Sequence, residues 1–147
     1  MMTTQNRIAA VDPGEEGAVA IYDRYRDRTE VFPMYEVRMC ESRYDFARKH
    51  HIDVIYVEEL PMVHSAPAIL SYDFGGWFEL LCQLDQRMNL VAPKVWQRTC
   101  QTPILPNYQV RKQWLHTRAK ELFPGLEFDK PEADALLILH HVIEKGL

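Results

Sequence analysis

The stretch Arg7–Asp12, with the sequence RIAAVD, predicts a short β-strand that is apolar along most of its length and ends on a carboxylate. The Pro-Gly-Glu-Glu segment that follows has the chemistry of a turn, and Gly17–Tyr22 (GAVAIY) predicts a second strand. A connection this short permits only antiparallel pairing. We therefore expect a β-hairpin in which Asp12 stands where the first strand leaves the core.

The elements expected after this hairpin alternate between strands and helices. A strand that follows a crossover helix returns parallel to the strand before it. We therefore expect an α/β fold with a mixed five-stranded sheet, three strands antiparallel and two added in parallel, flanked by helices. This order resembles the ribonuclease H-like fold. The further strands are predicted at Thr29–Tyr35, Val54–Glu58 and Leu90–Ala92, and the helices at Cys40–His50, Tyr72–Met88, Val110–Leu122 and Glu132–Glu144.

Size and composition indicate a single domain over residues 1–147, since 47% of the residues are hydrophobic. No apolar run approaches the roughly 18 residues of a membrane span, and the first residues contain no apolar stretch typical of a secretion signal. The three cysteines, Cys40, Cys82 and Cys100, form no CxxC pair, so we expect neither a zinc site nor a disulfide. Free thiols favour a cytoplasmic location.

Three carboxylates are the candidates for a catalytic, metal-binding site. Asp12 and Glu58 each end a predicted strand, and if these strands are parallel neighbours both side chains lie at one edge of the sheet, where α/β proteins bind ligands. Asp134 lies in an almost wholly apolar helix, where a carboxylate is costly to bury unless it is paired or binds a metal. Oxygen ligands of this kind favour Mg²⁺ or Mn²⁺. Two such ions about 4 Å apart can activate a water and stabilise the leaving oxygen of a phosphodiester.

Each of these acids also has a purely structural interpretation. Asp12 before Pro-Gly is ordinary turn chemistry, Glu58 can be a solvated strand end, and Asp134 can complement the dipole of its helix. Asp129 and Glu132 fit a capping box with proline in the first helical turn. That structural interpretation is preferred for Asp129, and the sequence leaves Glu132 open between a helix cap and a site residue.

The formal net charge of −4 argues against a nucleic-acid partner unless bound cations offset the acidic cluster. The basic residues are grouped along the chain, around residues 24–28, 38–49 and 111–120. In the last group Arg111 and Lys112 open a predicted helix, and Arg118 follows two turns later on the face of Arg111. We expect these three residues to contact DNA phosphates.

Taken in order, six short segments resemble the RuvC-like Holliday-junction resolvases, especially the small versions found in phages. The resemblance covers most of the chain, and it is the order of the segments rather than any one of them that is specific. The segments are Ala10–Gly14 with Gly17-Ala18, Val54–Glu58, Ser71 with Phe74–Gly76, Val91–Trp96, Lys112 with Arg118–Pro124, and Ala133–Leu137.

The resemblance implies a metal-dependent endonuclease that acts as a homodimer and resolves four-way DNA junctions by paired cuts, in a bacterial or phage-infected cell. Asp12, Glu58 and Asp134 carry over as ligands of Mg²⁺, which Mn²⁺ can replace, with two ions expected. Lys112 carries over as a phosphate contact. The family's fourth acid falls here on Pro131 or Lys130, so Glu132 is taken as a further catalytic residue, with Asp129 and Glu59 as alternatives.

Two other functions remain open from the sequence. A related ribonuclease H-like nuclease would act on another structured substrate, such as an RNA–DNA hybrid or a flap. A non-catalytic module would bind DNA junctions without cutting them. Substrate preference separates the first from a resolvase, and a nuclease assay separates the second.

Overall fold

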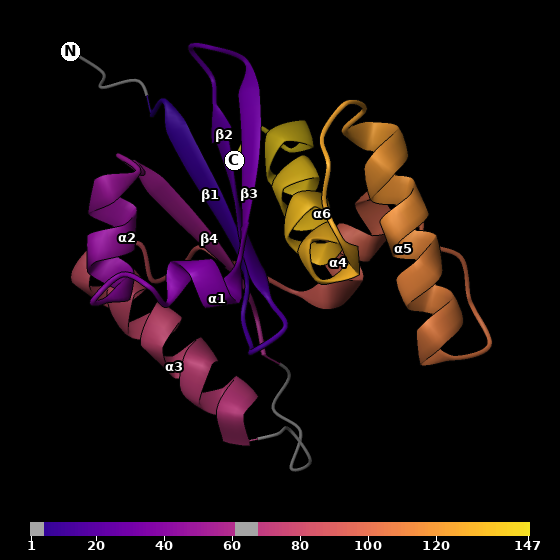
Figure 1. Cartoon of the computed structure of the whole chain (residues 1–147), viewed down its shortest axis with the longest axis horizontal. Coiled ribbons are helices and arrows are strands. Elements are labelled where there is room, and N and C mark those ends of the chain that lie inside the picture. The colour runs from indigo at the N-terminus through magenta and orange to yellow at the C-terminus, as the bar shows by residue number, and fades with distance from the viewer. Residues whose placement is uncertain (1–4, 61–67) are drawn as a thin grey trace.

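The structure, a computed structural model, describes residues 5–60 and 68–147. A five-stranded sheet forms the middle layer, with the strand order β3-β2-β1-β4-β5 (Figure 1). The strands are β1 (Arg7–Asp12), β2 (Ala18–Asp23), β3 (Arg28–Pro33), β4 (Val54–Glu58) and β5 (Leu90–Val91).

The pairing confirms the predicted mixed sheet. β1 is antiparallel to β2, which is antiparallel to β3, whereas β1 pairs in parallel with β4, and β4 with β5. Val11 lies opposite Val57 in the parallel pair. The next residues, Asp12 and Glu58, therefore leave the sheet side by side at the same edge.

Helices cover both faces of the sheet, with α1, α2 and α3 on one side and α4, α5 and α6 on the other (Figure 1). Alternate residues of each strand face opposite layers. On β1, Ile8 and Ala10 belong to the core under α4–α6, while Ala9 and Val11 belong to the core under α1–α3. The helices are α1 (Met34–Val37), α2 (Arg43–Lys49), α3 (Ala68–Gln83), α4 (Pro93–Thr99), α5 (Tyr108–Leu122) and α6 (Lys130–Glu144).

Small side chains allow α6 to lie close against the sheet. Ala10 and Ala20 on the strands and Ala133 and Ala135 on the helix are all buried in the same core cluster. Close packing of this kind leaves little room for water. Asp134, between the two helical alanines, is consequently buried as well.

Two short helices were not predicted. The third strand was expected to reach Tyr35, but β3 ends at Pro33 and α1 begins at Met34. Proline has no N–H to continue a strand ladder, and the turn into α1 buries Met34 and Val37. The helix α4 begins at Pro93 and buries Trp96. Proline is well suited to the first turn of a helix.

The predicted helices are present with shifted ends. Serine and asparagine caps set the starts of α2 and α5: Ser42 Oγ accepts from Asp45 N, and Asn107 Oδ1 accepts from Val110 N. The helix α3 ends at Gln83 rather than Met88, since Asp85 adopts the left-handed conformation at φ 58°. No helix in the described part of the chain is long and apolar enough to cross a lipid bilayer.

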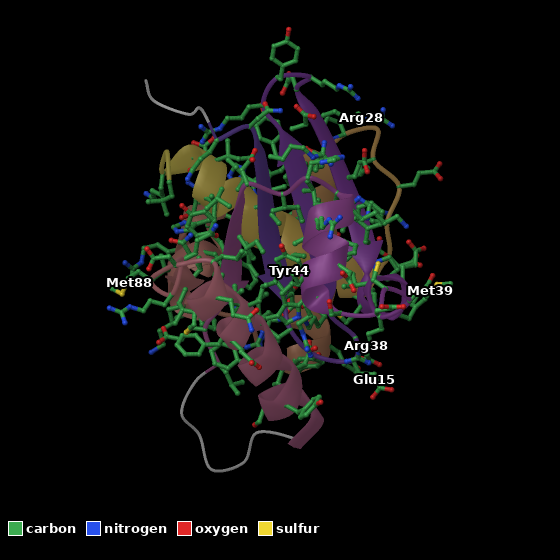
Figure 2. All side chains as sticks on the ribbon, turned by 90° about the vertical axis from the view of Figure 1, so that its left-hand side faces the viewer. Glu15, Arg28, Arg38, Met39, Tyr44 and Met88 are labelled. Carbon is green, nitrogen blue, oxygen red and sulfur yellow. The ribbon has the colours of Figure 1, made fainter. Side chains whose placement is uncertain are left out.

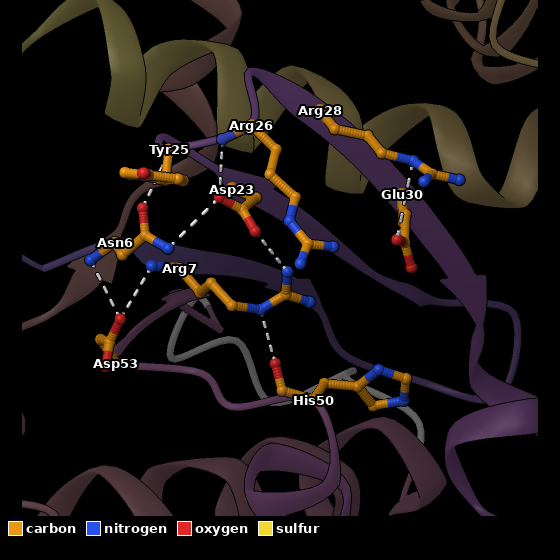
Figure 3. A network of polar contacts seen from close by, with 9 residues as sticks. All are labelled: Asn6, Arg7, Asp23, Tyr25, Arg26, Arg28, Glu30, His50 and Asp53. Carbon is orange, nitrogen blue, oxygen red and sulfur yellow. Dashed lines mark hydrogen bonds and ion pairs between the residues drawn. The ribbon is translucent and has the colours of Figure 1, made fainter.

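A polar network closes the sheet at the end opposite to Asp12 (Figure 3). Arg7 donates to Asp23 Oδ2 at 2.9 Å and to the His50 carbonyl at 2.6 Å. Asp53 Oδ2 accepts the backbone N–H groups of Asn6 and Arg7. These bonds fix the start of β1 against β2 and the segment before β4.

Candidate active site

The ends of β1 and β4 bring the carboxyl groups of Asp12 and Glu58 within hydrogen-bonding reach of each other. Asp134 on α6 lies close enough for its charge to act on both. The structure therefore brings together the three acids that the sequence analysis selected as metal ligands, from two strands and one helix.

Burial and the proximity of other acids change the protonation of Asp12 and Glu58. Burial, and then the charges of Asp134 and Glu58, raises the pKa of Asp12 well above its usual range. Burial raises the pKa of Glu58 to about 7, although a hydrogen bond from Trp96 acts in the opposite direction. The cluster therefore retains protons near neutral pH unless a cation replaces them.

Asp134 has one satisfied and one unsatisfied oxygen. Its Oδ2 accepts from Lys112 Nζ at 2.6 Å, whereas the buried Oδ1 has no hydrogen-bond partner within residues 5–60 and 68–147. Burial acts to lower the pKa of Lys112, but the charge and hydrogen bond of Asp134 prevail and raise it. Lys112 is therefore a resident cation beside the acidic cluster.

No group of three or more carboxylate, imidazole or thiol side chains in residues 5–60 and 68–147 is arranged to hold a metal ion as it stands. Lys112 and Trp96 each bind one oxygen of the cluster, on Asp134 and Glu58 respectively. The donor set nevertheless fits a divalent, oxygen-liganded cation. It consists of three clustered carboxylates, of which Asp12 and Glu58 have raised pKa values. The buried Oδ1 of Asp134 has no partner among the described residues.

The acids line a cleft of about 920 Å³. Its walls are the turn after β1, the first turns of α4 and α5, and the start of α6. The volume is in the range of ordinary ligand pockets, so it does not by itself select a ligand class. The cleft is open to solvent, and the basic start of α5 on its rim can contact a phosphate. The lining residues are Asp12, Pro13, Gly14, Glu15, Glu16, Gly17, Glu58, Leu60, Leu70, Pro93, Trp96, Gln97, Tyr108, Gln109, Arg111, Lys112, Leu115, Lys130, Pro131 and Asp134.

Two of the three predicted DNA-binding residues lie in this cleft. Arg111 is exposed, and its guanidinium carbon lies 5.7 Å from the centre of the Tyr108 ring; Lys112 Nζ lies 5.5 Å from the same centre. Arg118 is outside the cleft lining, where it donates to the Cys100 carbonyl at 3.2 Å and pairs with Glu121 at 3.0 Å. The structure therefore groups Arg111 with Lys112 and separates Arg118 from them.

The three candidates for a fourth acidic ligand lie outside the cleft lining. Glu132 is half-buried at the start of α6, where its Oε1 accepts from Asp129 N at 3.4 Å. Burial raises the pKa of Glu132. Asp129 and Glu59 are exposed. This arrangement agrees with the capping-box interpretation of Asp129 and Glu132.

Two residues of the site were missed from the sequence. Trp96 Nε1 donates to Glu58 Oε2 at 2.6 Å, and Asp73 Oδ2 accepts from Gly14 N at 2.7 Å, directly after Asp12-Pro13. Trp96 ends the segment Val91–Trp96, one of the six that resemble the resolvases, but the sequence assigned it no role. Asp73 had the same signal as Asp134, an acid within an apolar helix, and that argument applied to α3 would have found it.

No model of a protein family matches the sequence, and no curated protein matches it. Solved structures do match. A structure of Thermus thermophilus RuvC has 14% sequence identity and a TM-score of 0.58, with 95% of this chain and 96% of that chain covered. T. thermophilus RuvC in complex with a Holliday junction substrate has 13% identity and a TM-score of 0.55, with 96% of each chain covered.

At this level of identity the likeness establishes the fold. The chain is an α/β protein with the mixed sheet of the ribonuclease H-like class. Within that class it has the fold of the Holliday-junction resolvase RuvC.

Proposed function

We propose that the protein is a metal-dependent endonuclease that hydrolyses phosphodiester bonds in branched DNA and resolves four-way junctions by paired cuts. The observation that carries this proposal is the convergence of Asp12, Glu58 and Asp134 in one cleft, where one carboxylate oxygen has no partner in the part of the chain that the structure describes. The likeness to a RuvC structure that contains a Holliday junction supports the choice of substrate.

In this proposal Asp12, Glu58 and Asp134 hold Mg²⁺, or Mn²⁺ in its place, as a pair of ions. When bound, such ions supply an activated water and stabilise the leaving oxygen of the phosphodiester. The chain's own contribution is orientation, since Trp96 fixes one oxygen of Glu58 and α6 fixes Asp134. The protons held by Asp12 and Glu58 must leave before the ligands bind, so metal binding releases protons.

The DNA backbone is held, in the same proposal, by Arg111 and Lys112 at the start of α5. The cationic groups of both residues contact the Tyr108 ring, and all three residues line the same cleft as the carboxylates. Their positive charge therefore lies where a phosphate would enter the cleft. Arg118 would add a phosphate contact further along α5 if its ion pair with Glu121 broke. Local cations of this kind offset the negative net charge of the chain.

Glu132 enters the proposal as a cap of α6. Its bond to Asp129 N explains its position without a metal. Glu132→Gln should then lower stability by about 1 kcal/mol and leave turnover unchanged. A large loss of metal-dependent turnover with little loss of stability would instead assign Glu132 to the site.

A synthetic four-way junction tests the proposed function. We expect paired cuts with Mg²⁺, none with a chelator, and binding without cutting by Asp12→Asn. Linear duplex, flap and RNA–DNA hybrid serve as competitors in the same reaction. Faster cutting of the hybrid or flap, or undiminished cutting by purified Asp12→Asn, would contradict the proposal.

A further inference from the structure

Asp73 on α3 is a buried acid outside the cleft lining. Its exposed fraction is only 2%. A carboxylate at this depth is unfavourable unless its oxygens are hydrogen-bonded and its charge is balanced. Both of its oxygens have partners, and the partners come from two different parts of the chain.

The first partner is the backbone of the turn after β1. Asp73 Oδ2 accepts the N–H of Gly14 at 2.7 Å, and Gly14 is two residues beyond Asp12. Gly14 has φ +115°, which side chains rarely adopt, and a Cβ there would lie 3.3 Å from Leu70 on α3. The turn is thus pressed against α3, and Gly17 N closes it by donating to the Gly14 carbonyl at 3.0 Å.

The second partner is Arg43 at the start of α2. Its guanidinium donates to Asp73 Oδ1 at 2.8 Å, and Arg38 approaches the same oxygen at 3.9 Å. Gly76 leaves the space for this contact, because a Cβ there would lie 2.3 Å from the Arg43 guanidinium carbon. Figure 2 shows Arg38 at the same end of the molecule as Glu15 of the turn. The arginines balance the charge of Asp73, and the Gly14 bond uses its other oxygen.

We propose that Asp73 is a positioning residue for Asp12: it anchors the turn of residues 13–17 on α3 and so sets the direction in which the Asp12 carboxylate leaves β1. This inference rests on the proposed function, in which Asp12 is a metal ligand. Mutation of a residue that hydrogen-bonds to a metal ligand commonly lowers metal affinity or activity by about 10- to 100-fold. Asp73 acts one step further back, through the peptide that follows Asp12-Pro13.

The test compares Asp73→Ala with Asp23→Ala in the full chain without DNA. Asp23 is a matched control, because it is also buried and paired with an arginine, but at the opposite end of β1. Mn²⁺ binding is followed by electron paramagnetic resonance, and amide hydrogen exchange at Gly14 is followed by nuclear magnetic resonance in metal-free protein. We expect Asp73→Ala to bind Mn²⁺ about 10-fold more weakly and to exchange Gly14 faster. Asp23→Ala should lose stability and keep both properties.

A double variant separates the hydrogen bond from the charge. Arg43→Gln with Asp73→Asn keeps an acceptor for the Gly14 N–H and removes the guanidinium that donates to Asp73, while Arg38, 3.9 Å away and 44% exposed, stays in contact with solvent. This variant should therefore retain most of the Mn²⁺ affinity. It also provides the test if Asp73→Ala does not fold. Equal loss of Mn²⁺ affinity in the double variant and in Asp73→Ala would overturn the positioning role.

Other outcomes separate the inference from the proposed function. Unchanged Mn²⁺ affinity and Gly14 exchange in Asp73→Ala would overturn the inference and leave the function standing. Wild-type protein that binds Mn²⁺ but cuts no branched DNA would overturn the function, while weaker Mn²⁺ binding by Asp73→Ala would still support the inference. Wild-type protein without Mn²⁺ affinity would overturn both.

Discussion

Trp96 contributes to the site through a single atom. Its indole N–H holds one oxygen of Glu58, and the ring is otherwise packed in the core under α4–α6. Trp96→Phe keeps an aromatic ring and removes the donor. We expect a loss of about 2 kcal/mol of stability and about 10-fold in metal-dependent cleavage, measured by urea unfolding and by junction cleavage. Trp114→Phe makes the same chemical change at a half-buried position of the same core, and equal loss of cleavage in that variant would contradict a specific role for Trp96.

The raised pKa of Glu58 gives a second prediction, for the metal-free protein. Because its pKa is about 7 when folded, against an ordinary value of 4.5, the protonated side chain favours the folded state. This contribution is complete below pH 4.5 and is lost as the pH rises through 7. The unfolding free energy of the wild type relative to Glu58→Gln should therefore fall by on the order of 2–3 kcal/mol between pH 5 and pH 8. The comparison with Glu58→Gln removes the titration of the histidines, which both proteins share.

Addition of Mg²⁺ supplies the control for this pH dependence. In the proposed function a divalent ion would replace the protons of the cluster, so saturating Mg²⁺ should stabilise the wild type more at pH 8 than at pH 5. Denaturant titrations at the two pH values measure the effect. A difference between wild type and Glu58→Gln that is independent of pH would mean that Glu58 titrates normally.

The sequence pointed to three acids because each breaks a local pattern. Asp12 and Glu58 end apolar strands, and Asp134 interrupts an apolar helix. Trp96 breaks no such pattern, and Asp73 interrupts an apolar helix without the pattern showing which residue it contacts. Their roles come from contacts with residues 38 and 59 positions away. Such contacts depend on how α3 and α4 pack, which local sequence does not encode.

At the scale of elements, the strands and the helices α2, α3, α5 and α6 were predicted, whereas α1 and α4 were not. The four residues of α1 are too few to display a helical repeat of apolar positions, and α4 has seven, as many as α2. Both α1 and α4 begin at proline-containing segments that equally suit a turn. The antiparallel and parallel pairings followed from the lengths of the connections, which is why the mixed sheet was predicted correctly. That β1 lies beside β4 was only a condition of the site prediction, and the structure meets that condition.

The helix α5 gives a prediction about salt. Arg111 and Lys112 lie in the cleft, whereas Arg118 is bound to Glu121 and the Cys100 carbonyl. Removing a side chain that neutralises one phosphate should reduce the slope of log affinity against log salt by roughly one unit. We expect Arg111→Ala to show this change in junction-binding titrations, and Arg118→Ala to show a smaller one because its contact requires a broken ion pair. An unchanged slope in the Arg111/Lys112/Arg118 triple alanine variant would move the DNA path to another surface, such as Arg38–Lys49.

At the scale of the whole molecule, each chain carries a complete set of acids. Asp12, Glu58 and Asp134 come from β1, β4 and α6 of one chain. The acids line a cleft at one edge of the sheet, so in the proposed function one copy would offer one cutting site. A four-way junction has two-fold symmetry, and two cuts at symmetric positions call for two copies related by the same symmetry. The proposed homodimer follows because one proposed site per chain and two cuts per junction require two chains.

A mixed dimer tests this proposal directly. Wild-type chains and differently tagged Asp12→Asn chains are combined, and the species carrying both tags is purified. Its substrate is a supercoiled plasmid that extrudes a cruciform. Because each site is built within one chain, the mixed dimer retains one functional site and should nick the plasmid, whereas the wild-type dimer should make both cuts and linearise it. Linear product from the mixed dimer at the wild-type rate would mean that one site makes both cuts in turn. Failure to recover any doubly tagged species, with a wild type that elutes as a monomer and still linearises the plasmid, would contradict the homodimer.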